Sequence, residues 1–269
     1  MKTEQLILKH LKIQKPELKK LSDDARKHYL MLTSMIFDIH IIHRLMFFAN
    51  NDLMQYSHNV TQQPEHVKAA FASMQFLFLR ILIAKTYEMR EYIMNQKDMM
   101  DINNIPSAEA KEAIEEIHKY FSNKKIRRLF KFIRNKLSFH YEYEGKINEA
   151  VKKSFDKLDC FQMWLSEHDA GNELFPSTNF ILNDIVLQEM KEIGFAVNDT
   201  NYLDELFDLA FKPVDLFTKF CKHYLIDVVI AKHDIVLDDM GSIRIPVPPF
   251  SDIRLPFFVK PPSSSMSNK

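Results

Sequence analysis

The scarcity of glycine beside an abundance of phenylalanine is the feature that most restricts how this chain can fold. Its 269 residues include four glycines and 22 phenylalanines. A fold built of many short strands needs glycine at its tight turns, so an extensive β-sheet protein is disfavoured. The phenylalanines require a large buried interior, and a hydrophobic fraction of 46% can supply it. We therefore predict an all-α fold.

Charge, cysteine content and hydropathy exclude several classes of protein. Lys plus Arg and Asp plus Glu number 36 each, so no overall field draws the chain to nucleic acid or to a membrane. Two cysteines, Cys160 and Cys221, are too few for a disulfide framework. The N-terminus lacks the apolar run of a signal peptide, and the apolar stretches 35–49 and 71–84 are too short and too polar to span a bilayer. We expect a cytoplasmic protein that does not enter a membrane.

Helical periodicity and capping residues predict a series of helices. Ser22 is a suitable N-cap for a helix that runs to about Phe48, followed by a loop over 50–63. Pro64 suits the first turn of a second helix, at 65–96, whose apolar circumference places it in the middle of a bundle. Ser107 is the expected N-cap of the next helix. The later helices are predicted at about 107–121, 124–141, 146–168, 179–193 and 201–229.

Breaks in these patterns divide the chain into four predicted segments. Residues 1–21 form an N-terminal element, and residues 22–168 form an up-and-down helical bundle. The break at Asp169-Ala170-Gly171-Asn172 begins a C-terminal helical extension, 169–229. Prolines exclude helix from much of the last segment, 230–269, in which 236–247 is expected to form a small hairpin around Met240-Gly241. We expect this Pro-rich tail to wrap over the bundle or over a partner subunit.

The helix at 124–141 carries the charge pattern most suggestive of a function. Between residues 119 and 136 there are eight basic residues and no acidic one, namely Lys119, Lys124, Lys125, Arg127, Arg128, Lys131, Arg134 and Lys136. Such a stripe attracts phosphate groups without reading a base sequence. The alternative is a solvated face that pairs with acidic neighbours on other helices. The apolar side of this helix is predicted to comprise Ile126, Leu129, Ile133 and Leu137.

Arg134 and His140 stand late in this helix, but an ideal helix does not bring them together. At 100° per residue they lie about 120° and about 9 Å apart. They can converge only if the helix ends or bends before His140, or if each Arg134 meets the His140 of a second copy in a two-fold dimer.

The string Ile133-Arg134-Asn135-Lys136-Leu137-Ser138-Phe139-His140-Tyr141 resembles the signature of the HEPN superfamily. That signature is an Arg, usually followed by a polar residue, then four to six positions and a His, late in a helix of an α-helical bundle. Here five residues separate Arg134 from His140, and Asn135 occupies the polar position. The resemblance covers roughly residues 22–168 and implies a HEPN-like bundle there.

Many HEPN proteins are metal-independent endoribonucleases of toxin, abortive-infection and CRISPR-linked systems, and the resemblance implies roles for individual residues. His140 would be the general acid or base, Arg134 would hold the scissile phosphate, and Asn135 would orient the phosphate or the imidazole. The products would carry 2′,3′-cyclic phosphate and 5′-hydroxyl ends, and no metal or other cofactor is needed. Residues expected to guide the RNA are Arg127, Lys131 and Lys136, and those expected to support the site are Lys85, Tyr87, Glu88, Ser138 and Tyr141.

Other interpretations of the same residues stay open. His140 could be a core histidine with one hydrogen bond to Tyr87 or Glu88. Several HEPN-like proteins are non-catalytic, so the alternative function is a helical module that binds RNA or protein, and a third class is a scaffold without a ligand. The partners to expect are a second copy of the chain in a homodimer, RNA, and an antitoxin or other protein.

Two histidine patterns have the spacing of metal ligands but lack the further residues that a metal site needs. The Glu-x-x-His pattern from Glu115 to His118 matches the spacing of di-iron helix bundles, but it lacks the second copy and the two further carboxylates that such a site uses. His40 and His43 lie on one helix without a third ligand at helical spacing, which favours a polar notch in the core. We therefore predict no metal from the sequence.

Overall fold

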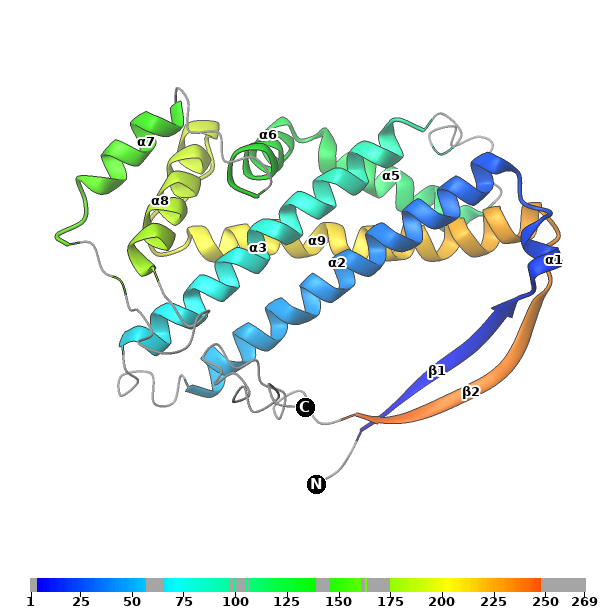
Figure 1. Ribbon diagram of the computed structural model, residues 1–269. Helices are drawn as coiled ribbons and strands as arrows, with labels where there is room; N and C mark the ends of the chain where they lie inside the picture. The colour runs from blue at the N-terminus through cyan, green and yellow to red at the C-terminus, as the bar shows by residue number, and fades with distance from the viewer. Residues whose placement is uncertain are drawn as a thin grey trace, which may run out of the picture.

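A computed structural model describes residues 4–56, 65–96, 99, 105, 107–138, 146–160, 163 and 175–247. Within these ranges the chain is a helical bundle with one two-stranded sheet, which confirms the predicted predominance of helix. Two long helices, α2 (Asp23–Tyr56) and α3 (Glu65–Met94), lie side by side along the molecule in Figure 1, and the other helices pack around them.

Helix α2 begins where its cap predicts but ends later than expected. The Ser22 hydroxyl accepts a hydrogen bond from the amide of Ala25 at 3.2 Å, and acidic residues occupy the first turn. The helix continues past Phe48 to Tyr56, so the predicted loop is wrong over residues 50–56. The polar residues there lack the proline or glycine that would stop a helix, and residues 57–64 lie outside the described ranges.

The basic helix is fixed to the bundle through an aromatic core. Helix α5 (Ala108–Ser122) packs against α9 (Tyr202–His223), and α6 (Lys124–Phe132) contacts α3, α5 and α8. The rings of Phe121 and Phe130 are 5.7 Å apart, and that of Phe217 stacks on Phe121 at 6.1 Å. All three side chains are fully or almost fully buried. Part of the abundant phenylalanine therefore packs α5, α6 and α9 together.

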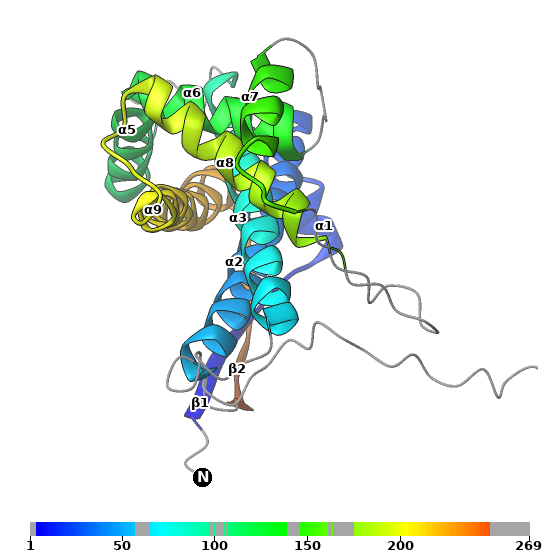
Figure 2. The same ribbon diagram turned by 90° about the vertical axis from the view of Figure 1, so that its left-hand side faces the viewer.

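The last helices share this core. Helix α8 (Pro176–Ile193) packs against α3, α6 and α7 (Lys146–Phe155), as Figure 2 also shows. Helix α7 ends at Phe155 in a turn rather than reaching residue 168. The predicted boundary at 169 lies in the stretch 164–174, outside the described residues. One cluster of buried side chains nevertheless runs from Leu21 to Ile235, on both sides of that boundary.

The sheet joins the two ends of the described chain. Strand β1 (Glu4–Ile13) pairs antiparallel with β2 (Leu237–Val247), with Glu4 opposite Val247 and Ile13 opposite Leu237. A short helix, α1 (Lys15–Leu18), follows β1. Figure 1 shows the two-stranded sheet extending from this end of the bundle, away from the other helices.

The predicted hairpin within 236–247 is wrong. The whole of 237–247 is one strand, and its partner is the N-terminal β1. Met240-Gly241 is the site of an irregularity opposite the Lys9–Leu11 stretch, and Gly241 takes a φ of 87° there. A residue pair that reads as a turn in the sequence is thus a bulge, a feature that also uses glycine with positive φ.

Among the described residues, one helical segment is long and apolar enough to cross a membrane by length and composition. It is Lys68–Met94, within α3, and 56% of its most apolar window is buried inside the bundle. A buried central helix has the same composition, as the sequence predicted for this stretch. The absence of a membrane association stays a prediction.

Candidate functional site

The basic helix is amphipathic, with its predicted apolar stripe buried. Its N-cap is Asn123, whose side chain accepts a hydrogen bond from the Lys125 amide at 2.9 Å. The predicted stripe of Ile126, Leu129, Ile133 and Leu137 is buried, and Phe130 is buried beside it. The opposite side of α6 faces solvent, and both Arg127 and Lys131 are exposed there.

The helix changes type where the Arg-to-His string begins. From Ile133 to Ser138 the chain forms a π-helix, η3, in which hydrogen bonds span five residues instead of four. A π-helix turns less per residue than an α-helix, so the 120° separation calculated for an ideal helix does not apply to this stretch. The predicted end or bend of the helix before His140 falls on residues outside the described ranges and stays a prediction. Single π-turns inside helices occur frequently at functional sites.

A buried arginine that the sequence prediction overlooked holds η3 on α3. The Arg80 guanidinium donates to the carbonyl oxygen of Leu137 at 2.7 Å, and the Ser138 hydroxyl donates to the carbonyl of Arg80 at 3.1 Å. Arg80 is 4% exposed, and its guanidinium lies 5.0 Å from the centre of the Phe76 ring. Ser138 thus anchors η3 to α3. A lone arginine in the apolar stretch 71–84 was the signal that a buried partner had to exist.

Arg134 is oriented by contacts from two elements. Its Nη2 lies 3.2 Å from Oε1 of Glu88 on α3, and its Nη1 donates to Oδ1 of the adjacent Asn135 at 2.9 Å. The side chains of Arg134 and Glu88 are each 31% exposed. The guanidinium is therefore held in direction, on a side chain that solvent reaches in part, and binding an anion from solvent requires both.

The ion pair continues across α3 to α2. The ammonium group of Lys85 lies 3.9 Å from the second oxygen of Glu88 and 3.1 Å from Oδ2 of Asp38. Charges thus alternate from Asp38 through Lys85 and Glu88 to Arg134. Lys85 and Glu88 were expected near the basic helix, and the structure does bring them together with Arg134.

The remaining site candidates have different positions. Tyr87 is 8% exposed and belongs to the core, and Lys136 is half-buried on η3. His140 and Tyr141 lie outside the described residues, so the distance from Arg134 to His140 is not defined. The possible hydrogen bond from His140 to Tyr87 or Glu88 also lies outside them.

The basic residues of α6 divide into two groups. Nε of Arg128 donates to Glu189 on α8 at 3.0 Å, and the Lys125 ammonium donates to the Gly194 carbonyl at 2.7 Å, so both serve to attach α8. Within the described ranges, Arg127 and Lys131 have no ion-pair partner. Burial, and then the charge of Arg127, lower the pKa of Arg90 on α3, while Tyr87 raises it. Arg127 therefore lies near enough to Arg90 for their charges to repel, although Arg90 is itself paired with Glu91.

The basic helix also contributes to a pocket. A pocket of about 490 Å³ lies between α5, α6 and α9, and its lining includes Lys119, Asn123 and Lys212 but neither Arg134 nor Glu88. Comparisons with protein-family models, curated proteins and solved structures find no match to this chain.

Proposed function

We propose that this chain is a HEPN-like endoribonuclease of a defence or toxin system, which cleaves RNA without a metal ion. The observation that carries the proposal is the setting of Arg134, which is held by Glu88 and Asn135, is partly exposed, and lies in the π-helix that begins at Ile133. A guanidinium with a fixed direction can bind two phosphate oxygens and offset the charge that develops in the transition state.

His140 supplies the proton chemistry in this proposal. An imidazole with an ordinary pKa near 6.5 can accept the proton of a ribose 2′-hydroxyl or donate one to the leaving 5′-oxygen at neutral pH. Attack of the 2′-oxygen on phosphorus breaks the bond to the 5′-oxygen and leaves a 2′,3′-cyclic phosphate and a 5′-hydroxyl. Asn135, besides orienting Arg134, offers an amide to the phosphate. Arg127, Lys131 and Lys136 guide the RNA backbone.

The test is an RNA-cleavage assay with a matched control. The wild type, Arg134→Ala, His140→Ala and Arg128→Ala are compared on a mixed-sequence single-stranded RNA in the presence of EDTA. We expect the first two variants to lose at least about 100-fold in rate. Arg128→Ala removes a guanidinium from the same helix, one that pairs with Glu189 instead, and should stay close to the wild type. Equal activity in all four proteins would disprove the nuclease proposal.

Mixing two inactive variants tests whether the site is shared in a homodimer. If Arg134 of one subunit acts with the His140 of a second, Arg134→Ala and His140→Ala subunits together rebuild one intact site per heterodimer. Activity then returns on mixing. A site contained within one subunit gives no rescue.

The exposed pair Arg127 and Lys131 favours a second candidate function, a non-catalytic module that binds RNA or an acidic protein. These two side chains are free to contact an anionic partner even if Arg134 serves only to hold η3 on α3. RNA binding that weakens steeply with salt, without cleavage products, would select this alternative.

A further inference from the structure

A second cluster of polar side chains lies on the seam between α5 and α9, in different contacts from Arg134. Lys219 on α9 forms ion pairs with α5, because its ammonium lies 2.7 Å from Glu112 and 4.0 Å from Glu116. One turn farther along α9 is His223, and η4 (Tyr224–Ile230), a π-helix, continues from it and carries Asp227. Glu109, in the first turn of α5, faces these two residues.

The three side chains converge closely. Glu109, His223 and Asp227 each offer one ligand atom, and the three atoms lie within 4.8 Å of one another. Nδ1 of His223 is 3.0 Å from Oδ2 of Asp227. The N-cap residue Ser107 lies between the carboxylates, with its hydroxyl 2.9 Å from Asp227 and 3.2 Å from Glu109.

The cluster opens onto solvent-accessible space. A pocket of about 490 Å³ is lined by Ser107, Ala108, Glu109, His223 and Asp227. The side chains of His223 and Asp227 are 24% and 36% exposed, so the ligand atoms are not sealed in the core. An ion could enter without rearrangement of the helices and could keep water molecules on its open side.

We propose that Glu109, His223 and Asp227 bind a divalent transition-metal ion, for which Zn²⁺ is the appropriate probe. One imidazole nitrogen with two carboxylates is a set that Zn²⁺ accepts at bond lengths near 2.0–2.2 Å, whereas Mg²⁺ prefers oxygen ligands alone. The carboxylates cancel the charge of a divalent ion, and the ion removes the repulsion between them. Three protein ligands leave a coordination position for water, as in open zinc sites.

The competing explanation is that the cluster is a set of ion pairs within the protein and binds no metal. A protonated His223 between two carboxylates would continue the ion pairs of Lys219, and it would need no metal. The N-terminal dipole of α5 also favours Glu109 and weakens its attraction for a cation. We therefore expect micromolar affinity for Zn²⁺ rather than the tight binding of a structural zinc site.

Titration of the full-length protein with Zn²⁺ tests the proposal. Isothermal calorimetry and thermal unfolding at pH 7.5 are carried out on the wild type, His223→Ala, Asp227→Asn and Glu112→Gln. We expect one Zn²⁺ per chain and a raised melting temperature in the wild type, and at least tenfold weaker binding in the first two variants. Glu112→Gln is the matched control, because it removes a carboxylate from the same helix outside the cluster and should bind like the wild type.

Two outcomes would overturn the proposal. One is the absence of saturable one-to-one binding in the wild type, which leaves the ion-pair explanation. The other is binding that both His223→Ala and Asp227→Asn retain, which places the ion elsewhere on the chain. Asp227→Asn leaves the side-chain volume almost unchanged, so it still tests Zn²⁺ binding at the cluster if His223→Ala does not fold. RNA cleavage in EDTA is independent of both results.

Discussion

At the scale of single residues, the contacts of Glu88 are better explained by geometry than by stability. Its carboxylate lies between Lys85 and Arg134, and all three side chains are about one-third exposed. Ion pairs with this much exposure contribute at most about 1 kcal/mol to folding. The pair instead restricts the rotamers of Arg134, whose long side chain would otherwise sample many directions. In the proposed nuclease, Glu88 is thus a positioning residue.

Replacing Glu88 with alanine should separate these two effects. We expect the free energy of unfolding to change by less than about 1 kcal/mol, while kcat for RNA cleavage falls about ten- to hundredfold because Arg134 is no longer aimed at the phosphate. KM should not rise, since removing a negative charge favours RNA binding. Urea denaturation and steady-state kinetics measure the two quantities.

Glu91→Ala is the control for this substitution. Glu91 lies on the same helix and pairs with Arg90, so its loss should leave kcat near that of the wild type. An unchanged kcat in Glu88→Ala would show that the pair with Arg134 has no role in cleavage.

The neighbours of Arg134 also show what can be predicted at this scale. Glu88 and Lys85 were expected to support the site because of the resemblance of this stretch to HEPN proteins. Arg80 was not, because its partner is a main-chain carbonyl, and no residue type in the sequence marks that acceptor. The π-helix was not predicted either, since it differs from an α-helix only in which backbone groups pair.

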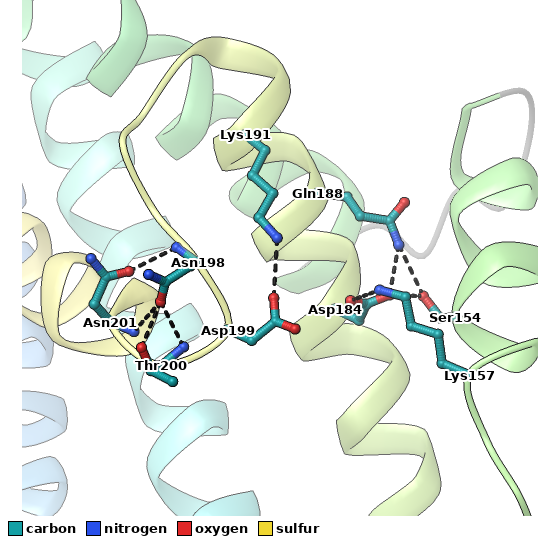
Figure 3. Close-up of polar contacts among 9 residues, drawn as sticks. All are labelled: Ser154, Lys157, Asp184, Gln188, Lys191, Asn198, Asp199, Thr200 and Asn201. Atoms are coloured by element: carbon teal, nitrogen blue, oxygen red, sulfur yellow. Dashed lines mark hydrogen bonds and ion pairs between the residues drawn. The ribbon is translucent and has the colours of Figure 1, made fainter.

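At the scale of elements, helix α7 is attached to α8 by a nearly buried carboxylate. Figure 3 shows Asp184 accepting hydrogen bonds from Ser154 and Lys157 of the α7 region and from Gln188 of α8, at 2.7, 2.6 and 2.6 Å. Asp184 is 7% exposed, and Ser154 is fully buried. Burial raises the pKa of Asp184, but hydrogen bonds from Lys157, Ser154 and Gln188 outweigh it, so the pKa lies below its ordinary value of 3.8.

We expect Asp184→Asn to loosen α7. The amide cannot replace the charged acceptor for three donors, so stability at neutral pH should fall by about 1–3 kcal/mol. Hydrogen exchange at the amides of α7 should accelerate most. The control is Asp199→Asn, because Asp199 is 80% exposed and pairs with Lys191 on the same helix. Equal protection of α7 in Asp184→Asn and the wild type would contradict the proposed attachment.

The same carboxylate predicts a pH dependence. A carboxyl group whose pKa is lowered in the folded state stabilises the protein above its unfolded pKa, and this contribution is lost as the pH falls from about 4 through the folded pKa. The wild type should therefore lose stability in that window more steeply than Asp184→Asn. Urea midpoints measured between neutral pH and pH 3 compare the two slopes.

Elements differ in how far local sequence determines them. The starts of α2 and α5 were predicted because their serine caps act within three residues. The pairing of β1 with β2 was not predicted, because Glu4 and Val247 lie almost a whole chain length apart in the sequence. No local pattern identifies a partner that distant. Met240-Gly241 was therefore interpreted as a turn, although a bulge uses glycine equally well.

At the scale of the whole molecule, charge is balanced globally and separated locally. The chain has no net charge, so an anionic partner is not attracted over long distances. The basic side of α6 is the exception, because it keeps exposed Arg127 and Lys131 while Arg128 and Lys125 are used to attach α8. Any RNA binding must therefore come from a few local phosphate contacts.

The salt dependence of RNA binding counts those contacts. For single-stranded nucleic acid, the slope of log affinity against log salt is about −0.7 per neutralised phosphate. If Arg127, Lys131, Arg134 and Lys136 each hold one phosphate, we expect a slope of about −2.8. The slope is measured by fluorescence anisotropy in a His140→Ala background, which prevents cleavage. Lys131→Ala should make it shallower by about 0.7, whereas Lys191→Ala, which removes an exposed lysine of α8, should leave it unchanged. Equal slopes in the Lys131 and Lys191 variants would place the RNA on another surface. The basic helix would then have no role in either proposed function.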